Sequence, residues 1–235
     1  MGQVKNQYFG DNRDLFKYDL ALTLVQAVPS LQRFTFIPML THQDGSGQGD
    51  VIERHKKAPG YKNKKLRDFL DECVVTNQRD VKEIKQYFNE NRVPIKLYGD
   101  DYYLERSCRQ AYFKNLSSVE LDDTLIFLDP DNGFQIKDSS EKHLLFTELH
   151  DLYECMGSGS VLMVFQYRPP FTSWDKLVME KMVQLDEHDL KPSMAVAAGD
   201  VSFFLFAKDL DVLDEIAGCI ERYRKTYPKL RIWNT

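Results

Sequence analysis

Two acidic residues follow the most strongly apolar run of the chain. Thr124–Leu128 contains only β-branched, aliphatic and aromatic residues, a composition typical of a strand buried on both faces. An acid, a proline, a second acid, an asparagine and a glycine come next, so the chain must turn out of the sheet. In an open parallel sheet, ligands bind at the carboxyl ends of the strands. Asp129, Asp131 and Asn132 are therefore candidate catalytic residues, unless this segment is a plain surface turn.

Carboxylates at this edge of a sheet could also bind a metal. Asp100 and Asp101 follow a second expected strand, Val93–Tyr98. With Asp129 and Asp131 they could supply the oxygen ligands that Mg²⁺ or Mn²⁺ needs in a nuclease or nucleotide hydrolase. The order of the residues along the chain does not by itself bring these acids into one ligand set.

A glycine-containing segment follows the first expected strand, Phe34–Leu40. Thr41–Asp50 has glycines at alternate positions, including Gly45 and Gly47, and glycine lets backbone amides approach a ligand closely. The spacing is not that of a dinucleotide-binding fingerprint, so a surface loop is an equally good interpretation. His42, next to the strand, can form hydrogen bonds at neutral pH.

Charged residues are concentrated at the start of the first expected helix, which the apolar spacing places from about Asp11 to Val28. Asp11 or Asn12 can cap this helix, and Pro29 follows its end. The charged residues form either a solvated face or a functional one, in which Arg13 or Lys17 points across the sheet toward an anionic ligand.

A basic stretch runs from Arg54 to Lys65 and is a candidate contact for nucleic-acid phosphates. An exposed loop and first helical turn would have the same composition. The whole chain has a net charge of -5 and a pI of about 5.6, which excludes a uniformly basic coat. Any nucleic-acid contact must therefore be local.

The composition is that of a soluble protein with a large core. Of its 235 residues, 43% are hydrophobic and 29% are charged, and no apolar run approaches the length of a membrane span. The N-terminal residues lack an apolar signal core, and the four cysteines are too widely spaced for a zinc knuckle or a compact disulfide framework. We expect a cytoplasmic protein with reduced thiols and no membrane partner.

Helical and strand patterns alternate through the middle of the chain, and a hairpin signal at Gly199-Asp200 comes late. No composition break divides residues 1–235. We therefore expect one α/β domain, a three-layer sandwich with a mainly parallel sheet and a late antiparallel hairpin. The further expected elements are helices near 66–73, 81–88, 102–116, 140–156, 174–185 and 210–227, and strands near 160–167, 194–198, 201–206 and 230–233.

Three segments resemble, in order and rough spacing, one family of class I S-adenosylmethionine-dependent methyltransferases. Gly10–Tyr18 resembles the Gly-Asn-x-x-Asp-x-x-Lys-His segment of the 23S ribosomal RNA adenine-N6 methyltransferase J family. Thr41–Gly47 is similar to the Thr-His-Ala-Gly-Ala-Gly cofactor loop of that family, and Leu125–Asp131 to its strand ending in Asp-Pro-Pro-Tyr.

This resemblance implies a Rossmann-like methyltransferase fold that binds S-adenosylmethionine. It also implies that Asp129 accepts a hydrogen bond from a target amino group, so that catalysis is mainly a matter of positioning. The acceptor would be a nucleic-acid base. The positions that the resemblance implies for the cofactor are Lys17, Tyr18, His42, Gly45, Gly47 and Asp100.

The chain departs from the family at the strand end. Asp131 and Asn132 replace the second proline and the aromatic residue, and that aromatic residue normally stacks on the flipped base. Phe134 is the nearest ring that could replace it. Two alternatives therefore stay open: the metal-dependent hydrolase, and an inactive methyltransferase-fold protein that binds a protein partner.

Overall fold

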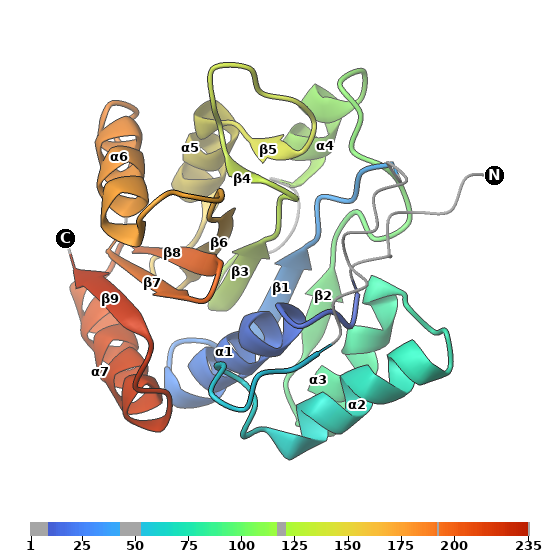
Figure 1. Cartoon of the computed structure of the whole chain (residues 1–235). Helices are drawn as coiled ribbons and strands as arrows, with labels where there is room; N and C mark the ends of the chain where they lie inside the picture. The colour runs from blue at the N-terminus through green and yellow to red at the C-terminus, as the bar shows by residue number, and fades with distance from the viewer. Residues whose placement is uncertain (1–8, 43–52, 117–120, 192, 235) are drawn as a thin grey trace.

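The computed structural model of the chain describes residues 9–42, 53–116, 121–191 and 193–234. A seven-stranded central sheet crosses these residues (Figure 1). Its strands, in spatial order, are β2 (Ile95–Leu97), β1 (Arg33–Ile37), β3 (Thr124–Leu128), β6 (Val161–Tyr167), β8 (Val201–Ala207), β7 (Met194–Ala198) and β9 (Arg231–Asn234).

The sheet is mostly parallel. β1 pairs in parallel with β2 and β3, and β3 pairs in parallel with β6. β8 is antiparallel to both β6 and β7, and β9 is antiparallel to β7. Five of the seven strands therefore run in one direction, and only β8 and β9 run against them. The expected parallel sheet with a late antiparallel hairpin is confirmed.

Helices cover both faces of the sheet, as in a three-layer α/β arrangement (Figure 1). One face is covered by α1 (Asp14–Ala27), α2 (Lys64–Val75), α3 (Ile84–Glu90) and α7 (Leu210–Thr226), and the other by α4 (Arg109–Leu116), α5 (Phe146–Cys155) and α6 (Trp174–Asp186). A short 3₁₀ helix, η1 (Val81–Glu83), precedes α3.

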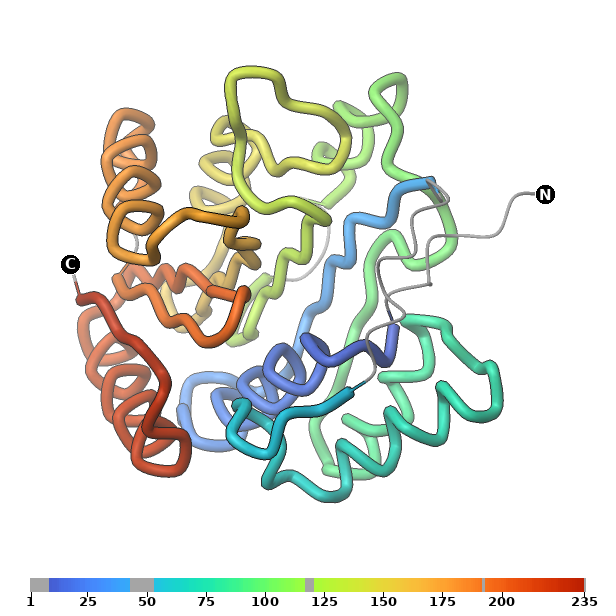
Figure 2. The backbone as a smooth tube through the Cα atoms, viewed as in Figure 1, coloured from blue at the N-terminus to red at the C-terminus, as the bar shows by residue number. Residues whose placement is uncertain are grey.

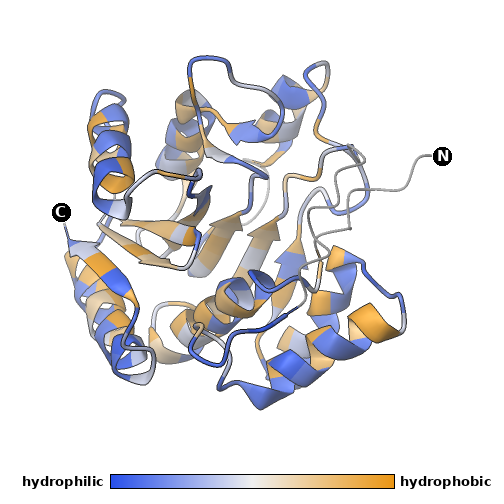
Figure 3. Cartoon of the chain, in the orientation of Figure 1, coloured by the Kyte–Doolittle hydropathy of each residue, from blue (hydrophilic) through white to orange (hydrophobic). Residues whose placement is uncertain are grey.

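The apolar residues of β3 serve both layers because successive side chains of a strand point to opposite faces. All five residues of β3 are buried. Leu125 and Phe127 belong to the core under α1, whereas Ile126 and Leu128 belong to the core under α4, α5 and α6. The strands are accordingly among the most hydrophobic parts of the molecule (Figure 3).

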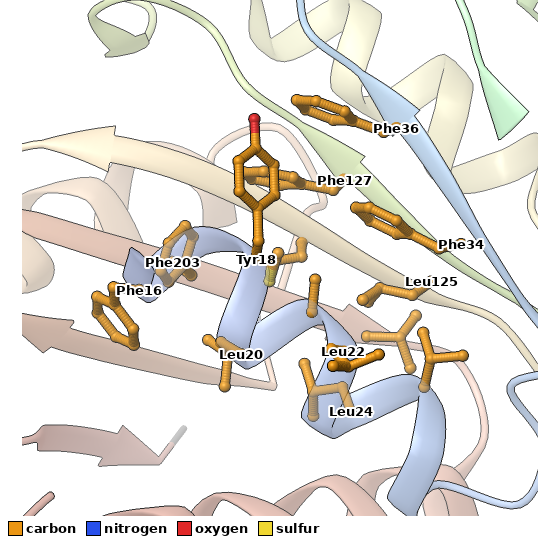
Figure 4. Close-up of a cluster of buried hydrophobic side chains, with 14 of the residues drawn as sticks. Phe16, Tyr18, Leu20, Leu22, Leu24, Phe34, Phe36, Leu125, Phe127 and Phe203 are labelled. Carbon is orange, nitrogen blue, oxygen red and sulfur yellow. The ribbon is translucent and has the colours of Figure 1, made fainter. Parts of the chain in front are cut away.

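Helix α1 is buried almost all round. It lies across the sheet, where Tyr18 packs edge-on against Phe36 and Phe16 packs against Phe203 (Figure 4). Its charged residues Asp14, Lys17 and Asp19 are also buried. The interpretation of its charged residues as a solvated face is therefore wrong.

The segment before α5 differs from the expected helix. That helix was expected over 140–156, but α5 begins only at Phe146. Before it, β5 (His143–Leu144) pairs in parallel with β4 (Gly133–Phe134). The side chain of Glu148 then accepts a hydrogen bond from the backbone N–H of Leu145 and fixes the start of the helix.

Candidate functional site

A cleft of about 200 Å³ opens at the carboxyl ends of three parallel strands. Pro38 follows β1, Asp129 follows β3, and Phe165 lies near the end of β6; each of them lines the cleft. The N-terminal turn of α1 forms the remaining wall. Its charged lining residues are the acids Asp11, Asp14, Asp129 and Asp131 and the bases Arg13, Lys17 and Lys142.

The centre of the cleft is a buried ion pair between α1 and the end of β3. The ammonium group of Lys17 donates a hydrogen bond of 2.8 Å to Oδ2 of Asp129 and lies 3.6 Å from Oδ1 of Asp14. The same ammonium lies 4.6 Å from the centroid of the Phe165 ring, a cation–π distance. The side chains of Lys17 and Asp129 are only 11% and 13% exposed.

A tight turn before α1 positions the other acids. Gly10 has a φ of +85°, a left-handed conformation that favours glycine, and its N–H donates a hydrogen bond of 2.8 Å to Oδ2 of Asp14. Oδ1 of Asp11 accepts hydrogen bonds from the backbone N–H groups of Arg13 and Asp14, at 2.8 and 3.3 Å. The helix begins at Asp14, its N-cap residue is Arg13, and Asp11 holds the turn just before it. Two carboxylates therefore lie at the N-terminus of α1, where the helix dipole favours negative charge.

Burial governs the protonation of this cluster. Burial raises the pKa of Asp129, although Lys17 acts to lower it, and it raises the pKa of Asp14 in the same way. Burial and the neighbouring Asp14 raise the pKa of Asp11 to about 6. Burial acts to lower the pKa of Lys17, but the three carboxylates more than offset it, so its pKa is raised. Lys17 therefore keeps its charge at neutral pH, and the carboxylates outnumber it.

The turn after β3 is held by hydrogen bonds. Oδ2 of Asp131 accepts a hydrogen bond of 2.6 Å from the hydroxyl of Thr41. The side chain of Gln166, on β6, donates to the carbonyl of Asn132 at 3.3 Å and accepts from the N–H of Phe134 at 2.9 Å. These contacts fix the backbone on both sides of the turn, so the turn forms an ordered wall of the cleft.

Five of the residues expected from the sequence thus share one cleft, and His42 and Asp100 do not line it. Lys17, Tyr18, Asp129, Asp131 and Asn132 line it together. The ring of Tyr18 also packs in the hydrophobic core (Figure 4).

The other expected cofactor positions lie elsewhere. His42 is exposed; its Nε2 lies 2.8 Å from Glu105, and its ring centroid is 3.8 Å from that of Tyr103. Asp100 accepts a hydrogen bond of 3.0 Å from Lys85. Gly45 and Gly47 lie outside the described residues.

The sequence did not single out two aromatic residues that line the cleft, Phe165 and Tyr167. Both lie near the carboxyl end of β6, and this position in a strand is the signal that could have pointed to them. The guanidinium of Arg13 lies 5.1 Å from the centroid of the Tyr167 ring. Phe134, by contrast, is buried in the core against Phe146 and Phe204, and its ring is not available to the cleft.

The candidate phosphate-binding stretch divides into buried and exposed residues. The Arg54 guanidinium is buried and donates hydrogen bonds to the carbonyls of Gly10 and Asp11 and to Asp71. It therefore braces the turn before α1. Lys56 and Lys57 are exposed.

Among the residues that the structure describes, no group of three or more His, Cys, Asp or Glu side chains is placed to hold a metal ion. None of the described helices is long and apolar enough to cross a membrane.

Comparison with known proteins gave no match: no family model, no curated protein and no solved structure is detectably similar to this chain.

Proposed function

We propose that the chain is a methyltransferase-like enzyme that binds S-adenosylmethionine and positions an acceptor amine against Asp129. The observation that carries the proposal is the buried Lys17–Asp129 pair at the carboxyl ends of parallel strands. A carboxylate there already accepts a hydrogen bond from one amine, that of Lys17. It can accept one from the exocyclic amine of a substrate in the same way.

The charge of the cleft suits a cationic cofactor. S-adenosylmethionine supplies a positively charged sulfonium whose methyl group is open to a nucleophile. Four acids, Asp11, Asp14, Asp129 and Asp131, line the cleft against three bases, Arg13, Lys17 and Lys142, and the face of the Phe165 ring already holds one cation, the ammonium of Lys17. The cleft is smaller than most ligand pockets, so these residues fit the sulfonium end of the cofactor.

The fold agrees with this assignment at the level of strand order. Parallel strands followed by a late hairpin are the arrangement expected of class I methyltransferases, and Asp100, just past β2, remains a candidate partner for the ribose. A Rossmann-like description of the domain is part of this proposal.

The proposed acceptor is a nucleic-acid base, brought to the cleft by contacts of the Arg54–Lys65 stretch with its phosphates. Tyr167 and Phe165 are the rings that could stack on such a base, since Phe134 is buried. Asp129 would orient the amine, and the buried surroundings would keep water from competing for it.

One observation favours a second candidate, an inactive binding protein that kept the fold. Lys17 fills the acceptor position of Asp129 with the protein's own amine. In an enzyme, a substrate amine would have to bond Oδ1 of Asp129 beside this ammonium or displace it, whereas a protein that only binds a partner needs neither. No specific observation favours the metal-dependent hydrolase.

A thermal-shift titration with S-adenosylmethionine tests the proposal. A ligand present at 100 times its Kd stabilises the native state by about 2.7 kcal/mol. For a chain of this length, that corresponds to a rise in Tm of roughly 5–10 °C. Asp11→Asn should reduce the rise, whereas Asp151→Asn should preserve it, because Asp151 is exposed and far from the cleft.

The chemical step needs its own readout. Asp129→Asn should lose methyl transfer to adenine-containing RNA and DNA oligonucleotides, whereas Asp11→Asn, which only weakens cofactor binding, should retain it at saturating cofactor. If millimolar cofactor leaves the Tm of the wild-type protein unchanged, the enzyme assignment is wrong and the second candidate remains.

A further inference from the structure

A second cleft lies on the other side of Arg13 and has a volume of about 640 Å³, within the usual range for ligand sites. Its walls are the loop 54–59, the start of α1 and the turn between β7 and β8. Lys229, just after α7, closes one end.

The charge of this cleft is the opposite of that in the first. Its described lining residues include Arg13, Arg54, Lys56, Lys57 and Lys229, together with His55. The one acid among them is Asp200. The whole chain has a net charge of -5, so this concentration of positive charge in one concave site is opposite in sign to the charge of the protein. Such a cleft attracts anions.

The loop that carries the basic residues is fixed to the fold. Gly60 has a φ of +83°, and a Cβ there would lie only 2.3 Å from the carbonyl oxygen of Leu15, so the loop lies directly against α1 (Figure 2). Arg54 bonds two carbonyls of the turn before α1, and the N–H of Lys62 donates to the hydroxyl of Tyr227 at 3.3 Å. The basic side chains therefore project from a rigid support.

The exposed cations of this cleft have no ion-pair partner among the described residues. Lys56, Lys57 and Lys229 are exposed and form no ion pair with any described residue. Lys64, in the same basic stretch but outside the cleft, is paired with Asp68. Only part of the basic stretch, with Lys56 and Lys57, therefore lines the cleft, and Lys229, which is 164 positions beyond Lys65 in the chain, lines it as well.

Arg13 is the remaining cation, and an anion can compete for it. Its Nε and Nη2 donate to Oδ2 of Asp200 at 3.1 and 2.8 Å, in a pair that is partly exposed. The turn that carries Asp200 is held in place because Arg168 donates hydrogen bonds to the carbonyls of Gly199 and Asp200.

We propose that this basic cleft binds phosphate groups, through Lys56, Lys57, Lys229 and Arg13. Lysine ammonium groups bind phosphate as point charges, and arginine binds it through its planar fork of donors. The phosphates can belong to a polynucleotide backbone or to a free nucleotide. This assignment does not depend on methyl transfer in the first cleft.

Fluorescence anisotropy with a labelled single-stranded RNA oligonucleotide, with tripolyphosphate and ATP as competitors, tests the cleft. The triple variant Lys56→Ala, Lys57→Ala, Lys229→Ala should bind about tenfold or more weakly. Losing three phosphate contacts should also reduce the salt dependence, log Kd against log salt concentration, by about 2. The matched control replaces three exposed lysines outside the cleft with alanine: Lys82, Lys137 and Lys176.

Asp200→Asn provides a test of opposite sign. It removes the one acid from the cleft lining and releases Arg13, so phosphate should bind several-fold more tightly. If the RNA binds and tripolyphosphate displaces it, the site is supported and a polynucleotide is the natural source of the phosphate groups. If the RNA does not bind, isothermal titration calorimetry measures tripolyphosphate and ATP directly, and their binding supports the site with a free nucleotide as the source.

The proposal is overturned if the wild-type protein binds none of these phosphate compounds, or if the cleft and control triples weaken binding equally. The thermal shift with S-adenosylmethionine is measured on the same variants. Because it reports on the first cleft, failure of one assignment is distinguishable from failure of the other.

Discussion

Replacing Lys17 with methionine should strongly destabilise the protein. Among the described residues, Lys17 is the only cation within bonding distance of both Asp129 and Asp14, so the change leaves both carboxylates without a partner in a largely buried site. Methionine is similar in length and apolar, so little cavity forms. Removing one partner of a buried ion pair typically costs about 3–5 kcal/mol.

The loss should depend on pH, because a carboxyl group can escape the penalty by taking up a proton. Neutralising Asp129 costs about 1.36 kcal/mol for each pH unit above its ordinary value of 3.8. This sets a ceiling on the part of the loss that comes from Asp129, of about 5 kcal/mol at pH 7.5 and about 2 kcal/mol at pH 5. In the wild-type protein the raised pKa of Lys17 keeps its stabilising contribution present until the pH passes its ordinary value of 10.5.

Urea unfolding followed by far-ultraviolet circular dichroism, at pH 5 and pH 7.5, measures both quantities. The control is Lys176→Met, on the exposed face of α6, which should change stability by less than about 0.5 kcal/mol. If Lys17→Met is as stable as this control at pH 7.5, or if its loss is the same at both pH values, the electrostatic reasoning is refuted.

Two further changes test the turn and the loop that flank the clefts. Asp11→Asn should raise the free energy of unfolding by about 1–3 kcal/mol at pH 8, measured by urea unfolding. Because the pKa of Asp11 is raised from 3.8 to about 6, its contribution to stability is fully present below pH 4 and is lost as the pH rises through 6. Asparagine does not ionise, so it removes this loss, and it keeps an acceptor for the backbone N–H of Arg13. Unchanged pH dependence between 4 and 6 would contradict this. Gly60→Ala should cost at least about 2 kcal/mol, because a Cβ meets the Leu15 carbonyl and φ is positive, whereas Gly199→Ala, with a positive φ but open space, should cost only about 1 kcal/mol. Equal losses in thermal or urea unfolding would show that the loop is not packed as described.

The elements that the sequence predicted well are those fixed by local pattern. The bounds of β3 were predicted correctly because an all-apolar run ends at an acid and a proline. The β7–β8 hairpin was predicted from its Gly-Asp turn, and β9 is the edge strand expected near the C-terminus. In each case the deciding residues are close together in the chain.

The errors have the opposite origin. The charged side chains of α1 look solvent-exposed in the sequence, because the partner that allows Lys17 to be buried, Asp129, is 112 positions away. Residues 140–145 were assigned to a helix, but they are drawn into the pairing of β4 with β5 and fixed by Arg109, which donates to the carbonyl of His143. The second cleft could not be predicted either, because it joins segments from four separate parts of the chain.

The two clefts meet at Arg13, which lines both of them. On one side the acids Asp11 and Asp14 and the carboxylate of Asp129 favour a cation or an amine; on the other side, lysines favour an anion. The face of Tyr167 lies under the guanidinium that separates them. A ligand with an amine-bearing ring at one end and a phosphate at the other would satisfy both charge patterns at once, and nucleotides have this arrangement. If one ligand spans both clefts, the charge of each cleft restricts which ligands can bind to the other. The assignments of the two clefts are still tested by separate measurements.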